Sequence, residues 1–260
     1  MSLIEIDGRK VEYFQEGEGP DLLLLHTLLA DASVYDTVVP RLAAERRVTR
    51  LSFPGFGASD PGPKSVDELA DWTADAMRAL GLPASTDVFA NGAGGFVAAG
   101  LAIRHGALFN RLVIADSGAA FPDAAKVPLR GMAEKVRKGG IETILDIAVA
   151  RMFPPDYVAA HPDVIDERKR RLMSVNASAF ADTCLALAAL DHRANLGRIK
   201  NPVLVAVGLE DQTTTPAMSR ELADGISGAA YVELEGVGHC PQIQDPDQLI
   251  EKVGPFLGLQ

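Results

Sequence analysis

The sequence has few cysteines and no leader-like start. Its only cysteines are Cys184 and Cys240, too few for the disulfide framework of a small secreted domain. The first residues lack the basic start and apolar core of a secretory signal. We therefore expect two free thiols and a cytoplasmic protein.

Long apolar runs and excess positive charge are also missing. The strongest apolar run near the start covers residues 22–25, whereas a membrane helix requires about 20. The 25 basic and 35 acidic residues give a net charge of -10, which argues against nucleic-acid or membrane partners held by a basic surface. A small-molecule partner is expected, and the oligomeric state, a homodimer included, stays open.

The apolar pattern indicates an α/β protein. Apolar and polar residues alternate over 4–6 and over 10–14. Asp7 and Gly8 between them suit a tight turn, so we predict an antiparallel hairpin. Continuous apolar runs typical of doubly covered strands follow, at residues 22–25, 48–51, 88–90, 112–115, 203–207 and 231–234. Helical stretches separate most of these runs, so we predict a mostly parallel, doubly wound sheet after the hairpin.

One long segment interrupts this alternation. Residues 119–198 carry only helical patterns, broken at Pro154-Pro155 and His161-Pro162. We expect residues 1–118 and 199–260 to form the core, and 119–198 to form a helical cap inserted before the last two strands.

Residues 88–97 pass from a strand through small residues directly into a predicted helix. Ala90 and Gly94 lie two positions before and after Gly92, and a sharp strand-to-helix turn needs small side chains there. A tight turn alone would explain the pattern, but a phosphate loop is disfavoured because the GxGxxG continuation is missing. Here the chain resembles the α/β-hydrolase family, whose nucleophile elbow reads small-x-nucleophile-x-small, and the resemblance extends over essentially the whole chain.

The resemblance places Gly92 at the position of the nucleophile, where the family has serine, cysteine or aspartate. Glycine adopts the strained backbone of an elbow without steric cost but supplies no reactive atom. Gly92 is therefore either an engineered replacement of serine or the mark of a variant without a covalent nucleophile.

Two further residues match the family in order and context. Asp211 follows the strand at 203–207, and His239 lies in a glycine-rich loop after the last predicted strand. The resemblance implies that the Asp211 acid orients His239, and that His239 acts as the base toward a nucleophile or water. The alternative is an unrelated loop aspartate and surface histidine.

The segment 25–29 resembles the family's oxyanion loop. By that match the amides of Leu28 and Ala93 would face a developing oxyanion, and Thr27 belongs to the substrate-binding loop, although Leu29 replaces a common glycine. This loop, the compact cap and the approach to Asp211 look most similar to the small-lactone hydrolases typified by 3-oxoadipate enol-lactonase.

Other residues could in principle replace the missing nucleophile. Cys240, Ser117 and Thr27 are candidates, but they lie on separate loops and attack needs reacting atoms within about 3–3.5 Å. The remaining histidines lack partners at metal spacing, and no cofactor or metal is implied. The basic run 168–171 either steers an anionic substrate or is a solvated helix face.

These observations predict an enzyme that cleaves a small ester or lactone with His239 and Asp211. One alternative is acid-base catalysis without a covalent intermediate, as in a lyase, a decarboxylase or a cofactor-free oxygenase. The other is a ligand-binding or signalling protein that retains the pocket without turnover.

Overall fold

The computed structural model describes residues 1–260 and contains one eight-stranded sheet in the order β1-β2-β4-β3-β5-β6-β7-β8. The strands are β1 (Ser2–Ile6), β2 (Arg9–Glu16), β3 (Asp21–Leu25), β4 (Arg47–Leu51), β5 (Asp87–Asn91), β6 (Leu112–Ala115), β7 (Val203–Gly208) and β8 (Ala230–Leu234). β2 pairs antiparallel with β1 and β4, and all other neighbours are parallel. The predicted fold class is confirmed.

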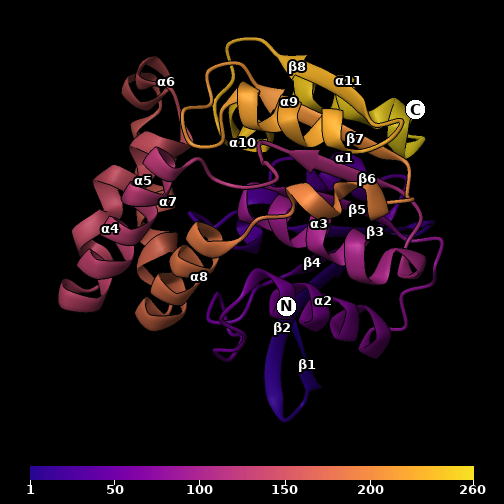
Figure 1. The fold of residues 1–260 in the computed structure, drawn as a ribbon, viewed down its shortest axis with the longest axis horizontal. Helices are drawn as coiled ribbons and strands as arrows, with labels where there is room; N and C mark the ends of the chain where they lie inside the picture. The colour runs from indigo at the N-terminus through magenta and orange to yellow at the C-terminus, as the bar shows by residue number, and fades with distance from the viewer.

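The central strands are buried along their whole length, as their uninterrupted apolar sequences require. The helices flanking the sheet are α1 (Val39–Ala43), α2 (Val66–Ala79), α3 (Ala93–His105), α9 (Pro216–Gly225), α10 (Pro241–Gln244) and α11 (Pro246–Leu257). α2 begins with a capping box in which Ser65 and Glu68 satisfy each other's backbone amides. α2 packs against α3, which continues directly from β5 (Figure 1).

The segment between β6 and β7 contains helices and no strand of the sheet. These helices are α4 (Asp123–Gly139), α5 (Leu145–Met152), α6 (Pro155–Ala160), α7 (Pro162–Met173) and α8 (Ala177–Ala189). They gather on one side of the molecule, with α4 packed along α8 (Figure 1). A single β-bridge between Ala120 and Asp191 joins the two ends of the segment, which we call the cap.

Short 3-10 helices complete the chain at Ala32–Tyr35, Gly106–Leu108, Ile141–Ile144 and Arg193–Arg198. Taken one at a time, the helices lack the combination of length and apolar composition needed to cross a membrane; α7 and α8, bent by 100°, meet it only as a pair.

Candidate active site

Gly92 lies at the apex of the turn between β5 and α3. Its backbone has φ 57° and ψ -119°, a region that glycine enters without the penalty a Cβ imposes. Two positions later, a Cβ on Gly94 would collide with the Leu25 carbonyl, and the Gly94 amide donates to the His26 carbonyl at 3.0 Å. The small residues around Gly92 therefore allow α3 to begin directly against β3.

His239 and Asp211 meet beside this turn. Asp211 Oδ2 accepts a hydrogen bond from His239 Nδ1 at 2.9 Å, and both side chains are buried. Asp211 Oδ1 accepts from the amides of Thr213 and Thr214 at 2.7 and 3.1 Å, and Oδ2 also accepts from the Thr214 hydroxyl at 2.7 Å. Each carboxylate oxygen thus has two donors.

The ionised state of Asp211 follows from these contacts. Burial acts to raise the pKa of Asp211, but the charge and hydrogen bond of His239 and the bonds from Thr214 and Thr213 together hold the pKa below its ordinary value. The carboxylate therefore keeps a proton on His239 Nδ1 and leaves Nε2 as the atom able to accept another.

Thr27 occupies the space that a side chain at Gly92 would need. Thr27 Oγ1 lies 3.1 Å from His239 Nε2, and the side chain is only 1% exposed. A Cβ built on Gly92 would clash with Thr27 Oγ1, lie 2.7 Å from Thr27 Cβ and lie 2.8 Å from His239 Nε2. The hydroxyl of Thr27 therefore reaches the imidazole through the space beside Gly92.

The structure does not bring the other two candidate nucleophiles to His239 Nε2. Ser117 Oγ donates to the Gly92 carbonyl at 2.9 Å, behind the turn. Cys240 is fully buried, and burial together with the charges of Asp116 and Asp211 raises the pKa of its thiol well above the ordinary range. Its thiol is consequently protonated and inert.

The loop that carries Thr27 is held by His26. His26 Nε2 accepts from the Phe53 amide at 2.9 Å, so Nδ1 carries the proton that is donated to the Thr27 carbonyl at 2.8 Å. Burial lowers the pKa of His26, which favours this neutral form. The loop is thereby tied to the glycine-rich turn after β4.

Two backbone amides face the same region. The Leu28 amide makes no hydrogen bond within the protein, and Ala93 is the first residue of α3, where an amide has no acceptor inside the helix. Leu28 and Ala93 also line one cavity together with Thr27 and His239. Leu28 and Ala93 therefore remain the predicted residues of an oxyanion site.

The cavity beside His239 is small and mostly apolar. Its volume is about 20 Å³, enough for one water molecule. The cap contributes Leu129, Met132, Arg151 and Leu187 to its wall. The cap therefore narrows the space beside His239.

Several residues that shape the site were not found from the sequence. Asn91 Nδ2 donates to the His239 carbonyl at 3.1 Å, and Gln242 Nε2 donates to Asn91 Oδ1 at 3.0 Å. The position of Asn91 next to Gly92 was the available signal. The sequence signal for Thr214 was its position three residues after Asp211. No local sequence signal pointed to Arg151.

The basic run 168–171 lies away from this cavity. Lys169 pairs with Asp146 at 2.6 Å, while Arg170 and Arg171 each pair with Glu167 at 2.8 Å. Arg168 is buried and donates to Ser33 Oγ at 3.1 Å. Each cation of the run thus has a carboxylate within 4 Å, Asp146 for Lys169 and the shared Glu167 for the three arginines.

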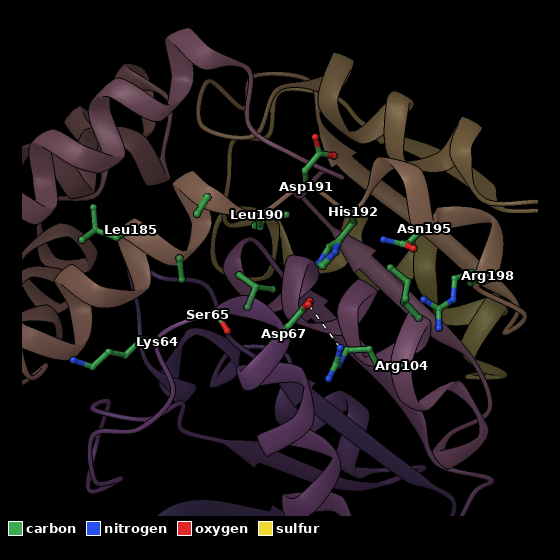
Figure 2. Close-up of a pocket in the computed structure, with 14 residues that line it drawn as sticks. Lys64, Ser65, Asp67, Arg104, Leu185, Leu190, Asp191, His192, Asn195 and Arg198 are labelled. Carbon is green, nitrogen blue, oxygen red and sulfur yellow. Dashed lines mark ion pairs between the residues drawn. The ribbon is translucent and has the colours of Figure 1, made fainter.

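A second cavity of about 460 Å³ opens between α2, α3 and the end of α8 (Figure 2). Its wall includes Arg104 paired with Asp67 at 3.7 Å, and His192, whose Nε2 donates to the Phe96 carbonyl at 3.2 Å. No acid-base pair like that of His239 and Asp211 faces it. No group of three or more metal-binding side chains is close enough to hold an ion.

Comparison with known proteins agrees with this geometry. The model of the alpha/beta hydrolase family matches residues 22–252. The chain belongs to the α/β hydrolase family. The resemblance inferred from the elbow and the oxyanion loop is thus confirmed at the level of the family.

The relatives include lactone and ester hydrolases. 3-Oxoadipate enol-lactonase 2 of Acinetobacter baylyi is 28% identical over 90% of this chain and 86% of its own length. A pimeloyl-[acyl-carrier protein] methyl ester esterase of Aeromonas hydrophila is 29% identical over 93% of this chain and 97% of its own. The crystal structure of the enol-lactonase from Burkholderia xenovorans LB400 superposes with a TM-score of 0.92 at 29% identity, covering 99% of this chain and all of the other.

Proposed function

We propose that this chain hydrolyses a small carboxylic ester or lactone, with His239 as the general base and Asp211 as the group that orients it. The observation that carries the proposal is the run of hydrogen bonds from Thr27 Oγ1 through His239 to Asp211, 3.1 and 2.9 Å long. A hydroxyl within reach of a base that a third group orients is the signature of an activated nucleophile. The ester and lactone hydrolases among the relatives support the reaction class.

In the proposed reaction Thr27 supplies the nucleophile that Gly92 lacks. Thr27 Oγ1 attacks the carbonyl carbon while its proton passes to His239 Nε2, and the amides of Leu28 and Ala93 stabilise the oxyanion. Collapse of the tetrahedral intermediate breaks the bond to the leaving oxygen, which takes the proton from His239. Water then attacks the acylated Thr27 by the same route, which releases the acid and restores the hydroxyl.

Direct attack by water is the second candidate mechanism. The cavity beside His239 has the volume of one water, and an imidazole that orients a water needs no covalent nucleophile. In that mechanism Thr27 only positions the water, so the two mechanisms predict different effects of removing its hydroxyl.

Kinetics with short-chain aryl esters and small lactones test the proposal. We expect Thr27→Val and His239→Ala each to lower kcat by about 10³-fold or more, and the double variant to lose little beyond either, because residues acting as a unit are not additive. Thr27→Ser should stay within about tenfold of the parent because it keeps the hydroxyl.

Thr73→Val is the matched control. Thr73 is a buried threonine of α2 whose hydroxyl donates to the Leu69 carbonyl at 2.8 Å, far in the fold from His239. Its replacement should leave kcat unchanged. Turnover that survives Thr27→Val but not His239→Ala would establish water as the nucleophile, and an inert parent chain would contradict the enzymatic proposal.

A further inference from the structure

Arg151 is the only arginine, lysine or carboxylate in the wall of the small cavity, which it shares with His239. It comes from the last turn of α5, and the other wall residues are apolar side chains, Ala93 and the three threonines Thr27, Thr213 and Thr214. A cation in a mostly apolar wall is costly unless a partner neutralises it.

The guanidinium of Arg151 has no partner in the protein. Its Nε is buried without a hydrogen bond, and the side chain takes part in no ion pair. The Asp211 carboxylate acts on Arg151 only through its charge, because its two oxygens accept from His239, Thr213 and Thr214. Most arginines of the cap surface pair with carboxylates, as Arg137 does with Asp182 at 2.7 Å and Arg170 with Glu167 at 2.8 Å.

The backbone around Arg151 is held by both loops of the site. The Thr213 hydroxyl donates to the Arg151 carbonyl at 2.8 Å, next to the acid. The His239 amide donates to the Met152 carbonyl at 3.1 Å, next to the base. Arg151 therefore keeps a defined position relative to His239 and Asp211, even though it belongs to the cap.

Burial also disfavours the charged form of the Arg151 guanidinium. The loss of solvent lowers the pKa of its guanidinium, and the charge of Asp211 offsets this only in part. An arginine stays protonated under these conditions, so the cation is present and its buried Nε has no acceptor within the protein. An anion in the cavity would supply one, most effectively a planar group that accepts two hydrogen bonds.

We propose that Arg151 binds a carboxylate of the substrate, so that the pocket selects esters or lactones whose acid part carries a second, anionic end. For its effect on catalysis this inference rests on the proposed function. It also assigns anion recognition to Arg151 rather than to the basic run 168–171, whose side chains contact Asp146 and Glu167 and do not line this cavity.

Two substrates of equal length test the inference, the aryl half-ester of glutarate and the aryl ester of pentanoate. We expect Arg151→Met to lower the ratio of kcat/KM for the anionic over the neutral ester by about 10- to 100-fold, the effect of losing hydrogen bonds between charged groups. Arg151→Lys keeps the positive charge but not the guanidinium, which can donate two parallel hydrogen bonds. It should therefore show a ratio between those of the parent and Arg151→Met. Arg170→Met removes an exposed cap arginine and should leave the ratio unchanged.

A binding measurement separates this inference from the proposed function. Glutarate should raise the Tm of the parent and of Arg170→Met more than that of Arg151→Met, with glutaramide as the uncharged control. If the parent hydrolyses esters but Arg151→Met changes neither the ratio nor the glutarate shift, the anion site is wrong and the proposed function stands. If glutarate stabilises the parent through Arg151 while no ester is hydrolysed, the anion site stands and the proposed function is wrong.

Discussion

At the scale of single residues, the Thr27 side chain keeps the site packed beside Gly92, which has no side chain of its own. Gly92 retains the backbone conformation of the turn, and the Thr27 side chain fills the volume above it. His239 Nε2 consequently has a hydroxyl partner at 3.1 Å that comes from a different loop.

This packing predicts the outcome of restoring serine at position 92. Gly92→Ser alone should destabilise the protein by about 1–3 kcal/mol, since its Cβ meets Thr27 in an already filled space. Adding Thr27→Gly removes that obstruction, so the double variant should be more stable than the two single effects predict and should hydrolyse esters faster than Gly92→Ser. Thermal unfolding and kcat of the four proteins measure both.

A Gly92→Ser protein as stable as the parent and already fast would contradict this packing argument. It would show that the Thr27 side chain leaves the space at little cost.

The residues of the site differ in how far their roles could be predicted. Gly92, Asp211 and His239 could be placed because each follows a recognisable strand, and parallel strands bring their carboxyl ends to one edge. Thr27 was one of three candidates to replace the missing nucleophile, each on a separate loop. The sequence could not choose among them, because tertiary contacts such as those of His26 set the direction of a loop side chain. Arg151 could not be predicted at all, since its setting depends on contacts between α5 and two distant loops.

At the scale of elements, the ends of β6 and β7 are joined by a second carboxyl group. Asp116 follows β6 with φ 51° and accepts from the Gly208 amide of β7 at 2.8 Å, while its Oδ2 has no partner. Burial and the charge of Asp211 raise the pKa of Asp116 well above its ordinary value. The raised pKa favours the protonated form of Asp116 in the folded protein.

The raised pKa of Asp116 makes a prediction with a definite sign. Because the folded pKa is raised, the ionised form favours the unfolded chain at pH 7, and the penalty disappears as pH falls below the ordinary value of about 3.9. Asp116→Asn should therefore be at least as stable as the parent at pH 7, with an advantage that vanishes in acid. Denaturant unfolding across this pH range measures it.

Asp116→Ala is the contrasting variant for that series. It leaves the buried Gly208 amide without an acceptor, which costs about 1–3 kcal/mol, and alanine tolerates a positive φ less well than asparagine. Destabilisation by Asp116→Asn at pH 7 as large as that by Asp116→Ala would show that Asp116 is ionised in the folded protein.

At the scale of the whole molecule, the sheet could be predicted more completely than the cap. A mostly parallel sheet after a hairpin follows from the alternation of strands and helices and from the turn at the start, all of which are local patterns. Which strand lies beside which depends on contacts between distant segments. The cap could be predicted as helical, but the docking of its helices on the His239 loop depends on contacts such as that between Met152 and His239. Periodicity carries no information on such contacts.

The two thiols report on the integrity of the whole fold. Cys184 in the cap and Cys240 in the core are both buried, and burial raises the pKa of Cys184 to about 12. A chromogenic disulfide reagent should therefore leave the native protein unmodified and react with two thiols per chain in denaturant. Rapid reaction of one thiol in the native state would show that its part of the fold opens locally.

The most direct test of the central claim is mass spectrometry of the protein after brief exposure to a reactive short-chain ester, followed by peptide mapping. The account predicts one acyl group per chain, located on Thr27, and no adduct in Thr27→Val or His239→Ala. Turnover that depends on His239 without any adduct, or an acyl group on another residue, would contradict the assignment of Thr27 as the nucleophile.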